Sequence, residues 1–147
     1  MGNPFAHIEL NTDALDQSKS FYKSVFSWKL QDMPDAGMGG YTLINVGKGV
    51  GGGMQTKQMP QAPTAWLPYV TVDNVAATLD KARNAGGQVV VDRMPIGDMG
   101  AIGIFVDPAG AALGVWEAAP KRKPAKKTAK KAAKKPATKA AKKKGKR

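Results

Sequence analysis

The chain has 147 residues, no cysteine and a formal net charge of +12. This length suits one domain and is too short for two ordinary ones. The lack of cysteine excludes disulfides, thiolate zinc sites and cysteine nucleophiles, and it favours a cytoplasmic protein. No apolar run is long enough to cross a bilayer, and the N-terminus lacks the pattern of a secretory signal, so we expect no membrane span and no export.

The positive charge is concentrated at the end of the chain. Residues 120–147 contain fifteen lysine or arginine residues and no acid. Residues 1–119 contain eight basic and eleven acidic residues, which is a net charge of −3. The sequence therefore predicts two different parts: a folded domain over 1–119 and a basic tail over 120–147.

The first half of the folded part predicts a strand, a helix and three further strands. Residues 5–11 alternate apolar and polar side chains, which is typical of a half-buried strand. Thr12 or Asp13 can cap the helix that follows. The apolar stripe of this helix comprises Leu15, Phe21, Tyr22, Val25 and Phe26. The three further strands are expected over 28–33, 41–46 and 49–56.

The second half predicts the same order of elements. Residues 66–72 alternate as a strand, and Asp73 or Asn74 can cap a helix that ends at Gly86–Gly87. The inward side chains of this helix are Val75, Leu79 and Ala82. Three strands are then expected over 88–93, 101–106 and 111–117.

These two halves form an internal repeat. A shift of 61 or 62 residues brings them into register and places Met94-Pro95 under Met33-Pro34. Two copies are too few for a solenoid, which needs about three units. We therefore predict one pseudo-symmetric domain of two βαβββ modules, over 1–57 and 66–119, joined by a linker over 58–65.

Three segments of this repeat, "HIELNTDALDQSKSFYKSVFSW", "PYVTVDNVAATLDKARNAGGQVV" and "FVDPAGAALGVWE", resemble the vicinal oxygen chelate superfamily. This superfamily contains glyoxalase I, the bleomycin-resistance proteins and the extradiol dioxygenases. The resemblance covers nearly all of residues 4–118 and implies an α+β fold with a curved, mixed and mostly antiparallel sheet around a cup. Ser27 departs from the pattern, because the family commonly has glycine there.

The resemblance also implies a metal site inside the cup. The family's ligands come from the first and last strand of each module, which places them at His7, Gln55, Tyr69 and Glu117. The repeat supports this choice, because His7 with Tyr69 and Gln55 with Glu117 have the same offset. His7, Gln55 and Glu117 would suit Zn, Ni, Co, Mn or Fe. Tyr69 departs from the family's ligands, since a phenol binds a divalent ion poorly unless its pKa is lowered.

Two functions remain open for the folded part. The resemblance implies a glyoxalase-like, divalent-metal-dependent lyase or isomerase on a small oxygenated substrate, with Glu117 as catalytic base and ligand. The alternative is a metal-free small-molecule-binding protein of the bleomycin-resistance type. Its ligand would contact Tyr69, Trp28, Trp66 and Trp116. A single histidine argues against an extradiol dioxygenase, whose iron site resembles two histidines and one carboxylate.

Each candidate metal ligand also has a structural interpretation. His7 can be a strand histidine whose hydrogen bonds are satisfied, and Gln55 an ordinary polar residue at a strand end. Glu117 can be a solvent-facing carboxylate at a strand terminus. The resemblance further implies a homodimer.

The basic tail has no large apolar side chain, so it cannot offset the entropy cost of ordering and is predicted to be disordered. Its lysine pairs among alanines and prolines resemble the tails of linker histones and of some bacterial histone-like proteins. This resemblance implies non-specific nucleic-acid binding through phosphates, nucleoid association, and a third candidate function as a DNA-associated architectural protein. The alternatives are a solubilising extension and contact with an acidic membrane surface. The predicted nucleic-acid contacts are Lys121, Arg122, Lys123, Lys126, Lys127, Lys130, Lys131, Lys134 and Lys135.

Overall fold

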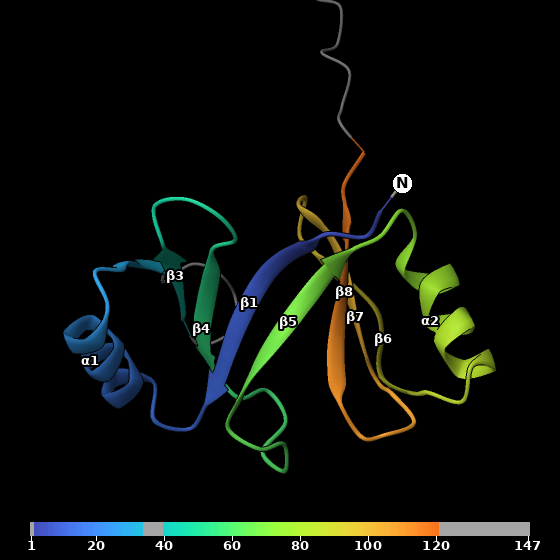
Figure 1. The fold of residues 1–147 in the computed structure, drawn as a ribbon, viewed down its shortest axis with the longest axis horizontal. Coiled ribbons are helices and arrows are strands. Elements are labelled where there is room, and N and C mark those ends of the chain that lie inside the picture. Colours follow the sequence, from blue (N-terminus) through green and yellow to red (C-terminus); the bar gives the residue numbers. More distant parts are fainter. Residues whose placement is uncertain (1, 34–39, 121–147) are drawn as a thin grey trace, which may run out of the picture.

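The computed structural model describes residues 2–33 and 40–120, and within them the predicted order of strand, helix and three strands occurs twice (Figure 1). The first module contains β1 (Phe5–Thr12), α1 (Leu15–Val25), β2 (Lys29–Met33), β3 (Tyr41–Asn45) and β4 (Gly52–Thr56). The second contains β5 (Ala65–Thr71), α2 (Val75–Asn84), β6 (Gln88–Ile96), β7 (Gly100–Val106) and β8 (Ala112–Ala118). The predicted α+β class is confirmed. The predicted nucleic-acid contacts in the tail lie outside the described residues.

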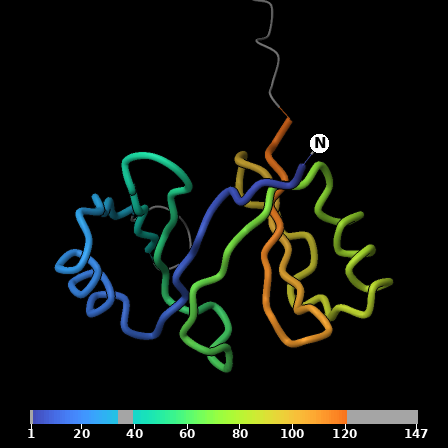
Figure 2. Tube along the Cα trace, in the orientation of Figure 1, coloured from blue at the N-terminus to red at the C-terminus, as the bar shows by residue number. Residues whose placement is uncertain are grey.

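All eight strands of the described part belong to one open sheet, in the order β2-β3-β4-β1-β5-β8-β7-β6. In each module the first strand pairs in parallel with the last, β1 with β4 and β5 with β8. The remaining pairs are antiparallel, including β1 with β5, which joins the modules at the centre of the sheet (Figure 2). The predicted mixed, mostly antiparallel sheet is confirmed. Among the described residues, no helix has the length and apolar character needed to span a membrane.

The two helices pack on one face of this sheet, at its two ends (Figure 2). Leu10 of β1 and Met54 of β4 belong to a core cluster that α1 covers. Val115 of β8 belongs to a second cluster with Val75 and Leu79 of α2. Because side chains alternate along a strand, the residues next to Leu10, Met54 and Val115 point to the other face.

We call this other side of the sheet the helix-free face. It has a polar half, formed by the first module and the start of the second, and an apolar half on β7 and β8. Strand pairing assigns to the polar half His7, Glu9, Asn11, Tyr41, Gln55 and Tyr69. It assigns to the apolar half Ile102, Ile104, Gly114 and Trp116.

The helix ends follow the sequence for α2 and differ from it for α1. Of the two caps predicted for α2, Asp73 and Asn74, the structure shows Asn74, whose side-chain oxygen accepts a hydrogen bond from the Ala77 amide at 2.8 Å. The cap predicted for the first helix is wrong, because the N-cap position is Ala14, which has no capping side chain. Thr12 instead accepts a hydrogen bond from the Ala14 amide at 3.1 Å, which stabilises the turn before the helix.

The apolar stripe of α1 is only partly used in packing. Leu15 and Tyr22 pack against the first core cluster. Phe21, Val25 and Phe26 are exposed, and no residue of α1 is fully buried. The stripe therefore predicts the helix correctly but overstates how deeply it is buried.

Gly103 of β7 lies beneath α2, at a position where a methyl group does not fit. A Cβ atom there would lie 2.8 Å from Leu79 Cδ1 and 2.9 Å from Val75 Cγ1. We predict that Gly103→Ala lowers the free energy of unfolding by about 1–3 kcal/mol, because overpacking displaces α2. Urea denaturation measures this, with Gly2→Ala as control because a Cβ at Gly2 meets nothing within 4 Å. Equal stability of the two variants would contradict the close packing.

Candidate functional site

The buried carboxylate of Glu9 is the centre of the polar half of the helix-free face. Its Oε1 atom accepts hydrogen bonds from Gln55 Nε2 at 2.9 Å, from the Tyr69 hydroxyl at 3.3 Å and from Asn11 Nδ2 at 3.3 Å. Its Oε2 atom accepts one from the Tyr41 hydroxyl at 3.2 Å. Glu9 is 8% exposed. Four donors from four strands therefore replace the water that this charge would otherwise require. We call these five residues the Glu9 network.

His7 is attached to the Glu9 network through Tyr41. Its Nε2 atom lies 2.6 Å from the Tyr41 hydroxyl, whose single hydrogen is donated to Glu9. With the Tyr41 hydrogen assigned to Glu9, His7 is the donor in this pair, which places the proton on Nε2 and the lone pair on Nδ1. Gln55 Oε1 is the only buried side-chain nitrogen or oxygen without a partner among the described residues. His7 Nδ1 has no hydrogen-bond partner there either, and it is not fully buried.

Burial controls the protonation of these side chains. It lowers the pKa of His7 below its ordinary value of 6.5, and the negative charge of Glu9 opposes this only in part. Burial, followed by the charge of Glu9 and a hydrogen bond to it, raises the pKa of Tyr41 and of Tyr69 well above the usual range of a phenol. Near pH 7 the imidazole is therefore neutral, and both phenols keep their protons.

The orientation of the Gln55 amide follows from its neighbours. Its Nε2 atom donates to Glu9 Oε1 and, at 3.1 Å, to Asn11 Oδ1. The reverse orientation would place three oxygens together, so the nitrogen must face Glu9. The Gln55 Oε1 atom consequently points away from the donors of the network and remains unpaired.

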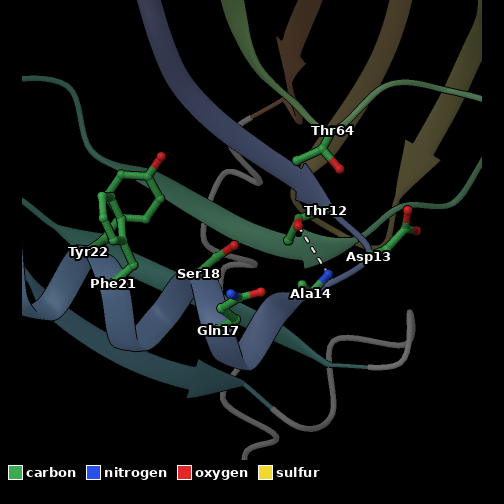
Figure 3. Close-up of a pocket in the computed structure, with 8 residues that line it drawn as sticks. All are labelled: Thr12, Asp13, Ala14, Gln17, Ser18, Phe21, Tyr22 and Thr64. Carbon is green, nitrogen blue, oxygen red and sulfur yellow. Dashed lines mark hydrogen bonds between the residues drawn. The ribbon is translucent and has the colours of Figure 1, made fainter.

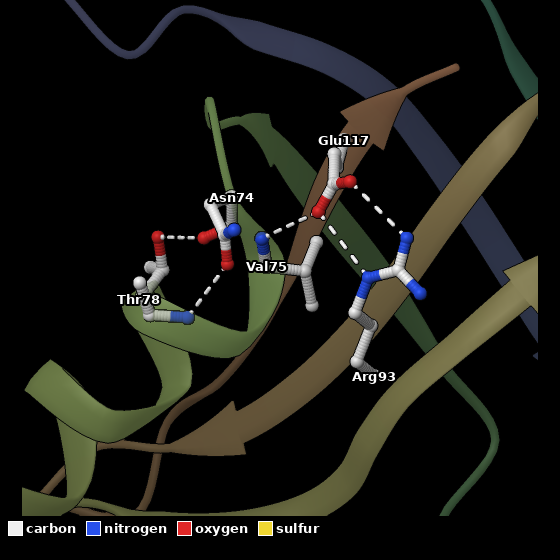
Figure 4. Close-up of polar contacts among 6 residues, drawn as sticks. Asn74, Val75, Thr78, Arg93 and Glu117 are labelled. Carbon is white, nitrogen blue, oxygen red and sulfur yellow. Dashed lines mark hydrogen bonds and ion pairs between the residues drawn. The ribbon is translucent and has the colours of Figure 1, made fainter. Parts of the chain in front are cut away.

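Glu117, the fourth candidate metal ligand, is held by Val75 and Arg93 (Figure 4). Its Oε2 atom accepts a hydrogen bond from the amide of Val75 at 2.8 Å, at the start of α2. Arg93 Nη2 donates to its Oε1 atom at 3.1 Å. Arg93, and next the Val75 amide, hold the pKa of Glu117 below its usual range. These contacts stabilise the helix start, where a negative charge is favourable.

The strand register explains why Glu117 is separated from His7. Asn11 pairs with Gln55 in the first module, and Tyr69 pairs with Gly114 in the second. The number of residues between two paired positions is therefore one larger in the second module than in the first. As a result Ala118, and not Glu117, occupies the position in β8 that corresponds to Gln55 in β4. A shift of one residue moves a side chain to the opposite face of a sheet.

The structure thus brings His7, Gln55 and Tyr69 together and leaves Glu117 on the helix side. The described residues contain no group of three His, Cys, Asp or Glu side chains that could hold a metal ion. The Glu9 oxygens, which lie on the same face as His7, already accept four hydrogen bonds. The side chains gathered around His7 therefore do not fit the metal site predicted from His7, Gln55 and Glu117. Metal binding stays a prediction.

The three tryptophans predicted to bind substrate do not lie together. Trp28 and Trp66 pack against the first core cluster, on the helix side, and the Trp66 indole donates to the Tyr22 hydroxyl at 3.0 Å. Trp116 lies on the helix-free face, paired with Thr71 two residues beyond the pair of Tyr69 and Gly114. Of the three, only Trp116 lies on the same face as the Glu9 network.

Two hollows of about 380 Å³ each are present in the described structure. The first lies at the start of α1 (Figure 3) and is lined by Thr12, Asp13, Ala14, Gln17, Ser18, Phe21, Tyr22 and Thr64, none of which is a candidate site residue. The second reaches the helix-free face at Leu43, two residues along β3 from Tyr41, and Lys29 is part of its lining. It therefore begins roughly 7 Å along the strand from the Glu9 network.

Glu9, Tyr41 and Asn11 were not identified as site residues from the sequence. The signal was nevertheless present for two of them, because His7, Glu9 and Asn11 alternate along one strand and must share a face. A carboxylate at the centre of a paired strand is unusual and indicates a polar network. Tyr41 gave no such signal, since its place depends on how β3 pairs with β4.

Comparison with known proteins identifies the family. Residues 5–115 match the sequence model of the glyoxalase/bleomycin resistance protein/dioxygenase superfamily, so the chain belongs to this superfamily. The protein CFP32 of Mycobacterium tuberculosis is 36% identical over 115 residues, and the anthracycline biosynthesis protein DnrV of Streptomyces peucetius is 27% identical over 125 residues. Each match covers 76% of this chain but only 44% or 46% of the relative, so the chain spans about half the length of these relatives.

Solved structures show the same fold at low sequence identity. The hypothetical protein BH1468 of Bacillus halodurans has a TM-score of 0.60 at 14% identity, covering 84% of this chain and 99% of that chain. A methylmalonyl-CoA epimerase of Mycobacterium tuberculosis has a TM-score of 0.57 at 17% identity, covering 80% and 89%. The resemblance to the vicinal oxygen chelate superfamily is confirmed. The homodimer and the cytoplasmic or nucleoid location stay predictions.

The single histidine allows a direct test of the site's electrostatics. We predict that NMR titration of the one imidazole signal gives a pKa below 6.5, because burial disfavours the charged ring. Glu9→Gln should lower this pKa further, since it removes the only charge that opposes the effect of burial. Glu117→Gln, a carboxylate change on the helix side, is the control and should leave it unchanged. A pKa at or above 6.5 in the wild type would contradict the buried network.

Proposed function

We propose that this superfamily member binds a small molecule on its helix-free face, around His7 and Tyr69, without a metal ion. The observation that supports this most directly is the Glu9 network. It holds a buried charge and two phenols in fixed positions, and it leaves His7 Nδ1 unpaired and not fully buried. Half-buried Trp116 and the hollow beside Leu43 add apolar surface and space on the same face.

The same geometry argues against the lyase or isomerase predicted from the sequence. Such a reaction builds negative charge on a substrate oxygen, which needs a hydrogen-bond donor or a cation beside it. The hydroxyl groups of Tyr41 and Tyr69 are directed at Glu9 instead. Glu117, the predicted base, lies on the helix side beside Arg93. Binding therefore fits the described residues better than catalysis.

A metal-free binding site predicts that small molecules perturb His7 in the presence of EDTA. We expect some members of a library of small hydroxylated and aromatic compounds to shift the imidazole NMR signal of His7 and to quench tryptophan fluorescence through Trp116. Trp116→Phe should abolish the quenching, whereas Glu117→Gln on the helix side should change neither signal. The library is tested again after incubation with nickel, zinc or manganese.

One set of results would overturn this proposal in favour of the metal-dependent enzyme. No compound would shift the His7 signal in EDTA, and elemental analysis after incubation would find one metal ion per chain. That metal would be lost in both His7→Ala and Glu117→Ala. Loss in His7→Ala alone would indicate a metal site other than the one the family resemblance implies.

A second candidate function rests on the charge of the tail. The fifteen lysine and arginine residues over 120–147, without a single acid, favour non-specific binding to nucleic acid. No aromatic residue is interleaved with them, so stacking on bases is not expected. We propose this as an activity additional to ligand binding, carried by a different part of the chain.

Phosphate contacts predict a strong dependence on salt. With six to ten contacts, the affinity of the full chain for a DNA duplex should fall about 10³- to 10⁵-fold between 50 and 200 mM salt. Fluorescence anisotropy with duplexes of unrelated sequence measures this, and the affinities should not depend on sequence. A chain ending at Ala119 should lose the binding, because residues 1–119 carry a net charge of −3. Retention of DNA by that shorter chain would contradict the assignment to the tail.

A further inference from the structure

We propose that the ligand group bound beside His7 is a hydrogen-bond donor without negative charge, such as a hydroxyl or an ammonium group, and that the site rejects carboxylates and phosphates. This inference rests on the proposed function and specifies its ligand. It is drawn from the direction of every hydrogen bond in the Glu9 network and from the sign of the charge at its centre.

Every donor group of the network already makes at least one hydrogen bond within it. The hydroxyls of Tyr41 and Tyr69 and the amide of Asn11 donate to Glu9, and the amide of Gln55 donates to Glu9 and Asn11. His7 Nε2 donates to Tyr41. Apart from the second N–H of the Asn11 amide, every N–H or O–H group on which an anionic ligand group could draw is already donated, mostly to a buried carboxylate.

Besides that second N–H of Asn11, two acceptor atoms remain unpaired in the described structure. Gln55 Oε1 is buried without a partner, and His7 Nδ1 carries a lone pair and is not fully buried. An acceptor is satisfied only by a ligand N–H or O–H group. The unpaired acceptor that a ligand can reach, His7 Nδ1, is therefore complementary to a donor and not to an anion.

The charge near His7 also favours a ligand group without negative charge. In the described structure, Glu9 is the one charged side chain whose charge shifts the pKa of His7, Tyr41 and Tyr69. Lys29 lies on the same face but opposite Asn45, four residues along β3 from Tyr41, which is roughly 13 Å. The field beside His7 is consequently negative, although the whole chain carries +12.

The second module supplies an apolar surface for the rest of the ligand. Trp116 pairs with Ile102, and Gly114 pairs with Ile104, on the same face as Tyr69. The side chains of Trp116, Ile102 and Ile104 are half-buried. Gly114 lies directly beneath the Tyr69 ring, so a side chain at that position would displace the ring. The expected ligand has an apolar, flat body over β7 and β8 and a donor group beside His7.

Three probes with the same ring separate the charge of the ligand from its shape: benzyl alcohol, benzylamine and benzoate. At pH 8 benzylamine is a cation, benzoate is an anion and the His7 imidazole is neutral. We expect benzylamine and benzyl alcohol to shift the single imidazole signal of the full chain with affinities about tenfold or more above that of benzoate. This order is opposite to the one that the net charge of the chain would produce.

Two further measurements test whether the charge of Glu9 causes the preference for benzylamine over benzoate. Glu9→Gln should reduce the preference for benzylamine over benzoate to about twofold or less, while Glu117→Gln on the helix side should retain it. Should Glu9→Gln fail to fold, salt takes its place: raising NaCl to 0.5 M should weaken benzylamine binding to the wild type and leave benzyl alcohol unchanged.

The outcomes separate this inference from the proposed function. Benzoate binding as tightly as benzylamine, or a preference that survives Glu9→Gln, would overturn the ligand class while small-molecule binding still stands. Benzoate binding that disappears in Lys29→Gln would assign the anion to the hollow beside Leu43 and would also overturn it. No shift with any of the three probes, nor with the library, would overturn the proposed function itself.

Discussion

The structure around the candidate site depends on how one buried carboxylate is stabilised. Glu9 has no cationic partner among the described residues, so its charge is stabilised by hydrogen bonds from Gln55, Tyr69, Asn11 and Tyr41. Each donor comes from β1 or from a strand in the same part of the sheet, and each must keep its position for the charge to remain buried. The network therefore fixes side-chain positions across four strands and, through Tyr41, the tautomer of His7.

The two modules use the same strand order for different purposes. On the helix-free face the first module carries polar side chains, with His7 and Glu9 at its centre. The second module carries the paired apolar residues Trp116 and Ile102 on this face. Pseudo-symmetry thus supplies a continuous surface, and the difference between the halves makes it amphipathic. A symmetric metal cup, as the family resemblance implied, would instead need equivalent ligands in both modules.

Glu117 illustrates how a correct repeat can give an incorrect site geometry. Its position near the end of the last strand was read correctly from the sequence, and its side chain is firmly held. The partners are nevertheless Arg93 and the first turn of α2, because the spacing from β5 to β8 is one residue longer than that from β1 to β4. In a sheet that difference decides which face a side chain joins. The face of the sheet also decides the role of Trp28 and Trp66. They pack on the helix side and so do not line the ligand pocket that the sequence predicts.

The sequence by itself determined the α+β class, the two βαβββ modules, a cap at Asp73 or Asn74 and the family, because periodicity and capping residues act over a few neighbours and repeat along the chain. It also determined that His7, Glu9 and Asn11 share a face, since alternation within one strand requires it. Only the tertiary structure decided that Tyr41, Gln55 and Tyr69 reach Glu9 and that Glu117 does not. These contacts depend on the pairing register between strands far apart in the chain, which no local pattern specifies.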